Sequence, residues 1–274
     1  MAGPPSEWEQ VLHYEAAVDI FTSLMAQCTA VESLAERAGD VIAREEMRSL
    51  RRAYLAELSE LDPRNRAAVD ETIREYGTIL ARKVEAPRPD PPARSGPRTR
   101  GLDRETRAAL FRDRIAPETI GTPYPRARPV AVIVTGPPGS GKTTALRRRY
   151  RDWDGIAPAL IDPGSYRAYH PHCWDLVLAT DAHADDVLGP DLLKWAAMAV
   201  DHTVGDRGDV LLAIGTGGPD TADAYATEFR AAGYRVETEA LTVPEDTADH
   251  ALSLRHRCRC GNWPALDIPP AVTE

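Results

Sequence analysis

The segment from Gly136 to Thr143 restricts the fold more than any other part of the chain. It reads Gly-Pro-Pro-Gly-Ser-Gly-Lys-Thr and fits the pattern Gly-x4-Gly-Lys-Ser/Thr at every fixed position. The apolar run Val130–Thr135 leads into it, and the helix-compatible stretch Thr144–Arg151 follows. Glycines allow successive backbone N–H groups to turn inward at the positive end of a helix dipole, where an anion is stabilised. The order strand, loop, helix therefore predicts a phosphate-binding loop (P-loop).

Such a loop predicts a bound nucleoside triphosphate, ATP or GTP, together with Mg2+. Lys142 would reach the β- and γ-phosphates, and the hydroxyl of Thr143 would bind the metal. The Asn-Lys-x-Asp motif with which switch GTPases read their base is absent from the sequence, which favours a small-molecule kinase. The residues predicted to bind the nucleotide are Gly136, Pro137, Pro138, Gly139, Ser140, Gly141, Lys142, Thr143 and Thr144.

Short apolar runs alternate with helix-compatible stretches throughout the second half of the chain. The expected strands are Val130–Thr135, Ala159–Ile161, Asp209–Ile214 and Val236–Val243, and one helix is expected over Leu102–Ile115. This alternation is typical of a parallel sheet covered by helices. The predicted fold is α/β, a P-loop kinase-like parallel sheet flanked by helices, preceded by a small all-α bundle.

The bundle is predicted from apolar residues at helical spacing between Ser6 and Val84. Ser6 and Glu9 form a capping box, in which each side chain bonds the other residue's free backbone donor at a helix start. Asp62-Pro63 is expected to begin a further helix, because proline loses no hydrogen bond at the first helical position. Three or four helices would form an antiparallel bundle with the apolar stripes as its core, and none of its residues is singled out as catalytic.

The predicted organisation is a bundle over residues 1–85, a linker over 86–101 and a kinase-like domain over 102–274. The stretch Ala86–Arg100 contains five prolines and four arginines and has no apolar periodicity. A composition of this kind cannot bury enough surface to order itself, so it is interpreted as a solvated tether.

Composition excludes several classes of protein. The chain has 274 residues, a net charge of −9 and no apolar run near the length of a membrane span, so neither a membrane nor a specific nucleic-acid partner is expected. The first residues do not form a secretory signal, which favours the cytoplasm. The four cysteines are expected to be free thiols. A zinc site at His170, His172, Cys173, His256, Cys258 and Cys260 is disfavoured, because the paired Cys-x2-Cys spacing is absent.

From about Arg107 onward, several short features follow one another in a recognisable order. They are the strand Pro129–Val134 leading into the loop, Ile161–Arg167, the pair His170-Pro171, Leu211–Thr216, Ala232–Tyr234, the pair Val243-Pro244, and Arg255. In this order they resemble the zeta toxin family of P-loop kinases, although only the P-loop is specific alone.

This resemblance implies ATP-dependent phosphorylation of a sugar nucleotide, UDP-N-acetylglucosamine, which would starve peptidoglycan synthesis and make the enzyme a toxin. The implied catalytic residues are Lys142, Asp162 and Arg255, of which Arg255 would brace the transferring phosphate. Asp162 would also orient the metal with Thr143. The implied substrate-binding residues are Arg167, His170 and Thr216. Arg257 could stand in for a second arginine of the family.

Two positions depart from the family pattern. Gly164 stands where the family has the acid that takes the proton of the acceptor hydroxyl, and Ile214 replaces a glutamate. General-base catalysis typically contributes a factor of about 10²–10⁴, so its loss is severe unless Asp162 substitutes. An active kinase, a catalytically impaired nucleotide-binding protein and an interaction protein built on the bundle therefore remain as alternatives.

The bundle itself has two interpretations. Family toxins are held inactive by a helical antitoxin that covers the nucleotide site, so residues 6–84 could inhibit the kinase-like domain in the same chain. Tethering would raise the local concentration to roughly millimolar, enough for a weak contact to keep the site closed. The alternative is a docking or dimerising module whose apolar stripes are used in its own core.

Overall fold

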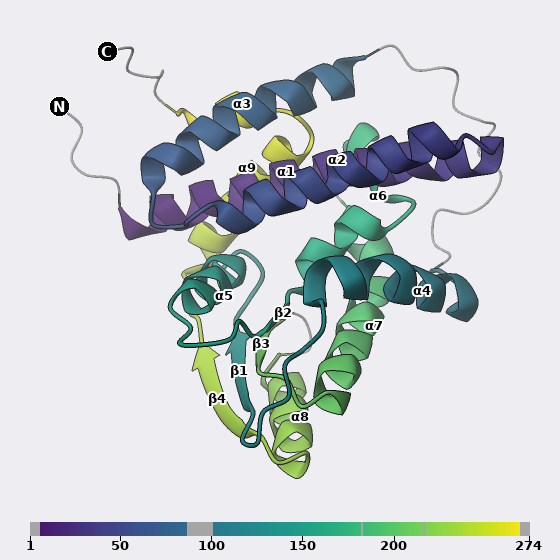
Figure 1. Cartoon of the computed structure of the whole chain (residues 1–274). Coiled ribbons are helices and arrows are strands. Elements are labelled where there is room, and N and C mark those ends of the chain that lie inside the picture. The colour runs from purple at the N-terminus through teal and green to yellow at the C-terminus, as the bar shows by residue number, and fades with distance from the viewer. Residues whose placement is uncertain (1–5, 87–100, 182, 216–217, 269–274) are drawn as a thin grey trace.

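The structure, a computed structural model, describes residues 6–86, 101–181, 183–215 and 218–268. It has a layer of long helices on one side and an α/β part on the other (Figure 1). Three N-terminal helices, α1 Glu7–Ala38, α2 Val41–Glu60 and α3 Arg66–Glu85, form most of the first layer. The other helices are α4 Arg104–Leu110, η1 Phe111–Ile120, α5 Lys142–Arg151, η2 Pro163–Tyr169, α6 Cys173–Leu178, α7 Ala184–Gly205, α8 Gly218–Ala231, α9 Glu245–Arg259 and η3 Trp263–Leu266.

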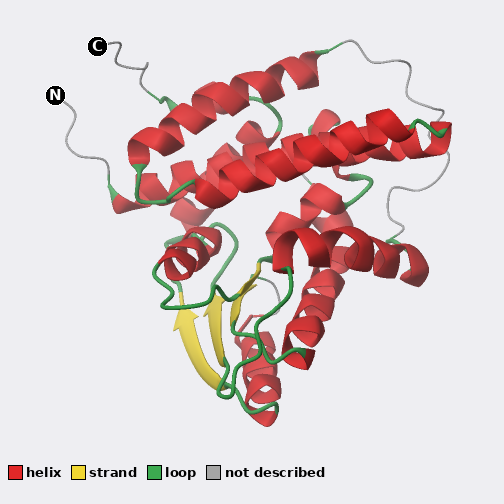
Figure 2. Ribbon diagram, in the orientation of Figure 1, coloured by secondary structure: helices red, strands yellow, loops and turns green. Residues whose placement is uncertain are grey.

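The α/β part is built on a four-stranded parallel sheet in the order β2-β3-β1-β4 (Figure 2). The strands are β1 Val130–Thr135, β2 Ala159–Ile161, β3 Val210–Ile214 and β4 Arg235–Ala240. All four fall within the predicted ranges or within one residue of them. The prediction of a parallel sheet flanked by helices and preceded by helices is confirmed.

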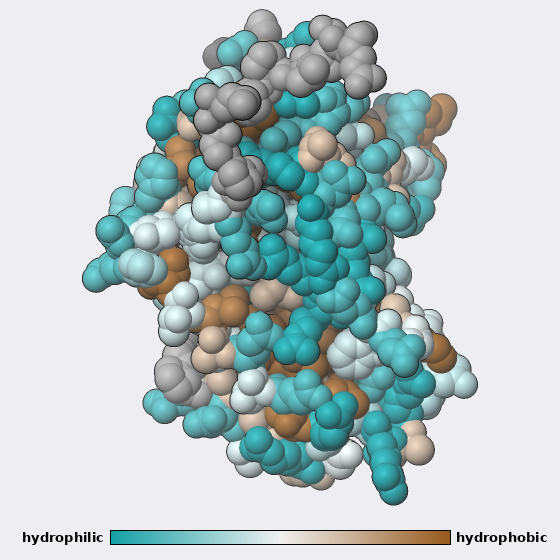
Figure 3. Space-filling model, turned by 90° about the vertical axis from the view of Figure 1, so that its left-hand side faces the viewer, coloured by the Kyte–Doolittle hydropathy of each residue, from teal (hydrophilic) through white to brown (hydrophobic). Residues whose placement is uncertain are grey.

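Alternate residues of the central strands face different helices, because successive strand side chains point to opposite faces. Ile133 and Leu212 face the main core, to which α7 and α8 also contribute, whereas Val132 and Leu211 pack with Leu146 of α5. Figure 3 views the molecule from the side on which α5 and β4 lie, and apolar side chains are visible among polar ones in its lower half. On the α5 face, a hollow of about 480 Å³ is lined in part by Val130, Val132 and Trp153.

Helix α1 is buried on every side rather than along one stripe. Fifteen consecutive residues, Leu12–Ala26, are all buried, and the helix contacts α2 and α3 as well as α5, α6, α9 and η2. Its apolar residues form one continuous cluster with Leu80 of α3 and Ile133 of the sheet. The apolar residues of α1 therefore serve both the bundle and the α/β part, instead of only the bundle.

The helix ends agree with the sequence in one case and differ in two. The Ser6–Glu9 capping box is present, with Ser6 N donating to Glu9 Oε2 at 2.7 Å. The predicted start at Asp62-Pro63 is wrong, because α3 begins at Arg66 and the side chain of Asn65 accepts from the backbone N–H of Ala68 at 3.1 Å. The single helix predicted over 102–115 is α4 followed by a π-helix, η1, with Pro117 inside it.

The described part of the chain contains no helix long and apolar enough to cross a membrane.

A buried polar group joins α7 to the beginning of the α/β part. Asp191, which is 0% exposed, accepts from the backbone N–H of Leu102 at 2.7 Å and from Arg107 at 3.0 Å. His170 is 2% exposed, lies against Trp195 and has its Nε2 atom 3.6 Å from Asp191. Burial lowers the pKa of His170 to about 4, since the charged imidazolium would be desolvated.

The depressed pKa of His170 predicts that the protein loses stability as the pH falls. An unfolded-state histidine titrates near 6.5, so the unfolded chain binds this proton first and favours unfolding between about pH 6.5 and 4. We expect His170 to remove about 3 kcal/mol of unfolding free energy across that window. Denaturant unfolding of wild type and His170→Gln should show a difference that shrinks at low pH.

The control for this prediction is His183→Gln, since the side chain of His183 is 82% exposed. A wild-type and His170→Gln pair whose stability difference is constant from pH 7 to 4.5 would contradict the buried, neutral state of His170.

Candidate active site

A pocket of about 220 Å³ lies between the P-loop, α1 and α9. It opens at the carboxyl ends of β1 and β3, the edge at which parallel α/β sheets bind ligands. Its polar lining includes carboxylates, cations and the hydroxyl group of Thr143, which come from six segments of the chain. These are Glu15 and Asp19 of α1, Lys142 and Thr143 at the start of α5, Asp162, Arg167 of η2, Asp185 of α7, and Arg255 and Arg259 of α9.

The P-loop has the left-handed residues that its turn requires. Gly139 and Gly141 have φ angles of 79° and 87°, which residues with a side chain rarely adopt. The ammonium group of Lys142 donates to the carbonyl oxygens of Gly136 and Pro137, at 2.9 and 2.6 Å. Burial lowers the pKa of Lys142. Lys142 therefore bonds its own loop and has few protein anions to offset its desolvation.

Asp162 follows β2 and lies next to the first turn of α5. The hydroxyl of Thr143 donates to its Oδ2 atom at 2.7 Å, and the backbone N–H of Gly164 donates to Oδ1 at 3.0 Å. Hydroxyl and carboxylate oxygens are the ligands that Mg2+ prefers. The structure thus brings Thr143 and Asp162, which were assigned to a metal from the sequence, within hydrogen-bond distance.

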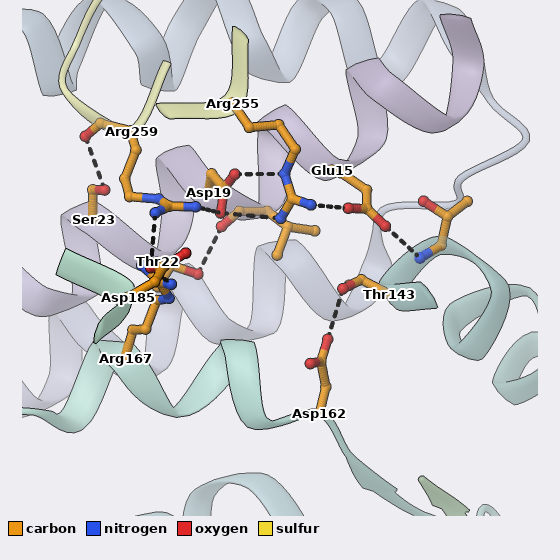
Figure 4. Close-up of polar contacts among 12 residues, drawn as sticks. Glu15, Asp19, Thr22, Ser23, Thr143, Asp162, Arg167, Asp185, Arg255 and Arg259 are labelled. Atoms are coloured by element: carbon orange, nitrogen blue, oxygen red, sulfur yellow. Dashed lines mark hydrogen bonds and ion pairs between the residues drawn. The ribbon is translucent and has the colours of Figure 1, made fainter. Parts of the chain in front are cut away.

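Two carboxylates of α1 point into the pocket and meet the arginines of α9 (Figure 4). Arg255 forms ion pairs with Glu15 and with Asp19, the latter with a distance of 2.7 Å from Nε to Oδ2. Arg259 reaches Asp19 at 3.3 Å. Burial alone would raise the pKa of Asp19, but the charges of Arg255 and Arg259 outweigh it and lower that pKa. The Asp19 carboxylate is therefore held charged.

Helix α1 also touches the P-loop itself. A Cβ atom added at Gly141 would lie 2.7 Å from Cγ1 of Val11, so the Val11 side chain packs directly on the backbone of the loop. Oε1 of Glu15 lies 3.5 Å from the backbone nitrogen of Thr144 in the first turn of α5. A carboxylate thus lies at the helix N-terminus that follows a P-loop, where the phosphates of a nucleotide are bound.

Arg167 is incompletely paired. Its side chain pairs with Asp185, but the buried Nη1 atom has no hydrogen-bond partner among the described residues. Burial and the nearby charge of Arg259 lower the pKa of Arg167 to about 9. An anion entering the pocket would offset both effects.

The other sequence-based assignments have mixed outcomes. His170 does not line the pocket and is buried beside Trp195. Thr216 lies outside the described residues. Ile214 is buried in the main core. Arg257 is exposed, and Arg259 is the second arginine of α9 that lines the pocket, after Arg255.

Sequence reasoning missed four charged residues of this pocket: Glu15, Asp19, Asp185 and Arg259. For Glu15 and Asp19 a signal was available. The two acids lie four residues apart inside an otherwise apolar stretch, and buried carboxylates require partners.

The P-loop after β1, the Thr143–Asp162 pair and the arginines around one pocket define a P-loop phosphotransferase fold. Comparison with family models gives the particular family: residues 113–265 match the zeta toxin model. The chain belongs to the zeta toxin family, as its motifs predicted.

Solved structures and curated sequences add little to this assignment. A match at 20% identity and a TM-score of 0.47 is to a structure described for the PezAT chromosomal toxin–antitoxin system of Streptococcus pneumoniae. It covers 59% of this chain and 66% of that one, slightly less than two thirds. No curated protein matches the chain.

The P-loop assignment predicts that Lys142→Ala weakens nucleotide binding. The substitution removes a cation from the β- and γ-phosphate position and leaves the loop backbone in place, so we expect a loss of about 10- to 100-fold in affinity for ATP with Mg2+. Isothermal titration of the full chain measures it. The control is Lys194→Ala, whose side chain is 54% exposed on α7. Equal affinity in Lys142→Ala and wild type would contradict the assignment.

Proposed function

We propose that the chain is an ATP-dependent kinase that phosphorylates a sugar nucleotide such as UDP-N-acetylglucosamine and so acts as a toxin. We further propose that helix α1 restrains it. One observation carries both parts: the P-loop, Asp162 and the arginines converge on a pocket into which α1 inserts Glu15 and Asp19. Membership of the zeta toxin family supports the class of reaction. GTP in place of ATP is the alternative nucleotide.

In this proposal each pocket residue acts on charge or position. Lys142 and the N–H groups of the loop bind the triphosphate, and Arg255 with Arg259 neutralises charge on the phosphoryl group as it moves. Thr143 and Asp162 would hold Mg2+, which shields the β- and γ-oxygens when bound. Arg167 would contact an anionic group of the acceptor. Thr216 stays a proposed sugar-nucleotide contact.

Restraint follows from competition between carboxylates and phosphates for the same partners. Glu15 lies near the backbone nitrogen of Thr144 and pairs with Arg255, and both groups are needed by the nucleotide in the proposed mechanism. A phosphate can bind there only if α1 moves. This role for residues 6–84 in the same chain is favoured over a separate antitoxin, because α1 already occupies the pocket.

The restraint predicts that Glu15→Gln binds ATP more tightly than wild type. The amide keeps the shape of the side chain but loses the charge that pairs with Arg255, so the docked helix is weakened while the nucleotide's contacts remain. We expect affinity for ATP with Mg2+ to rise by about tenfold, measured by titration of the full chain.

A matched control for Glu15→Gln is Glu46→Gln, an identical change at an exposed position of α2. Equal affinities for ATP in wild type and Glu15→Gln would contradict the proposal that α1 restrains nucleotide binding. Substitution is preferred to deletion of residues 1–101, because deletion would uncover apolar side chains of η2, α6 and α9 that α1 covers.

A second function, a nucleotide-binding protein impaired in phosphoryl transfer, is favoured by Gly164. The remaining acid, Asp162, already accepts from Thr143 and from the backbone of Gly164, so it is engaged on the metal side of the pocket. Nothing at Gly164 can take the proton of an acceptor hydroxyl.

The two functions are separated by Gly164→Asp, made together with Glu15→Gln to open the site. The φ angle of Gly164 is not positive, and a Cβ atom there would lie 3.3 Å from Oδ1 of Asp162, so a side chain fits with a small adjustment. We expect the turnover rate with ATP and UDP-N-acetylglucosamine to rise above that of Glu15→Gln alone, by up to the factor of about 10²–10⁴ that a general base typically contributes. The control is Gly164→Asn. No increase, with complete loss in Asp162→Asn, would make Asp162 the working base.

A further inference from the structure

A second group of buried charges lies at the other end of α1, away from the pocket. We call it the distal charge cluster; its members are Glu32 of α1, Arg48 and Arg51 of α2, and Arg114 and Glu118 of η1. Glu32 and Glu15 are separated by 17 residues of one helix, or about 25 Å at 1.5 Å per residue. None of the five residues lines the pocket.

Four of the five side chains are almost fully removed from water, and Arg48 is 29% exposed. The side chains of Glu32 and Arg51 are 0% exposed, and that of Glu118 is 8% exposed. Arg51 donates to both carboxylate oxygens of Glu118, at 3.1 and 2.8 Å, and also to Glu32. Arg114 reaches Glu32 at 3.1 Å. The hydrogen bonds of Arg48 and Arg51 outweigh the effect of burial on Glu32 and lower its pKa.

Two of these contacts join the N-terminal helices to the α/β part. Arg51 and Glu32 belong to the former, and their partners Glu118 and Arg114 belong to η1. The Arg51–Glu32 pair lies within the N-terminal helices and would survive their movement, whereas Arg51–Glu118 and Arg114–Glu32 would separate. The cluster therefore responds to whether the two parts are docked.

The segment that supplies Arg114 and Glu118 has an unusual backbone. η1 is a π-helix of 10 residues with Pro117 inside it, whereas π-helical geometry is rare and mostly limited to single turns at functional sites. Arg114 and Glu118 are four residues apart, close to one π-helical turn, so both face the N-terminal helices. An unfavoured local structure is therefore present where ion pairs join the two parts.

We propose that the distal charge cluster is a latch that sets how often α1 is docked over the pocket. This proposal rests on the restraint proposed above, and it assigns control of that restraint to the distal charge cluster. With the helices docked, each buried charge has partners; with them apart, Glu118 and Arg114 return to water. Loss of one partner penalises the docked arrangement more than the open one, because an unpaired charge is costly only while buried.

The latch can act on the pocket because α1 is one rigid element that spans both sites. A ligand that needs the open arrangement binds with an apparent affinity reduced by the fraction of molecules that are open. Weakening the cluster raises that fraction and tightens nucleotide binding without altering any group that touches the nucleotide.

The test is titration of the full chain with ATP and Mg2+, comparing wild type with Glu118→Gln. This variant leaves the Arg51–Glu32 pair of the N-terminal helices intact. We expect affinity to rise by about tenfold, as it would if the open fraction rose by the same factor. Asp113→Asn, at a side chain 56% exposed on the same helix, should change affinity less than twofold.

General destabilisation is separated from unlatching by Tyr234→Phe, which removes a buried hydrogen bond to the carbonyl of Gly208 far from the cluster. It should lower thermal stability without changing affinity. If Glu118→Gln does not fold, Arg114→Gln, which also breaks a contact between the two parts, should give the same increase.

Three outcomes distinguish the proposals. Tighter binding in both Glu118→Gln and Glu15→Gln supports the latch. Tighter binding in Glu15→Gln alone overturns the latch and leaves the restraint standing. Unchanged binding in both overturns the restraint, and the latch falls with it.

Discussion

The burial of α1 is the constraint on which the rest of the structure depends. Fifteen consecutive residues of this helix are removed from water, and they pack against the other N-terminal helices as well as η2, α6 and α9. Hydrophobic burial on this scale favours the docked position of α1, and with it the positions of Val11 at the P-loop and of Glu15 and Asp19 in the pocket. The chain therefore carries the cover of its pocket as part of its own core.

The charges on α1 complement those of the arginines that line the pocket. Arg167 is buried, and the side chains of Arg255 and Arg259 are only 15% and 12% exposed. Cations so far removed from water are kept only when anions pair with them. In the docked arrangement the anions come from Asp19, Glu15 and Asp185. In the proposed catalytic arrangement phosphate groups would replace the two acids of α1. Under this proposal the same three arginines would suit two states, and the balance between the states would set the affinity for nucleotide.

Local signals made the P-loop and the strands predictable, because each lies in a short stretch whose residue types dictate its shape. The role of Asp162 beside Thr143 came from the family resemblance instead, since the two residues are 19 positions apart. The contacts of α1 were not predictable in this way. Asp19 and Arg255 are 236 residues apart in the chain, and only the assembled core brings them together. His170 was assigned to the cleft by resemblance, yet its burial beside Trp195 directs it elsewhere. The π-helix η1 has no sequence pattern that marks it. Helix α3 begins after Asn65, whose side chain caps it, and not at Pro63.

The central claim is that α1 must leave the pocket when nucleotide binds. Amide hydrogen exchange of the full chain, with and without saturating ATP and Mg2+, tests this most directly, since protection of residues 12–25 reports whether the helix remains packed. The account predicts faster exchange of these amides in the nucleotide-bound protein, with the P-loop more protected. Saturated binding with residues 12–25 as protected as before would contradict it.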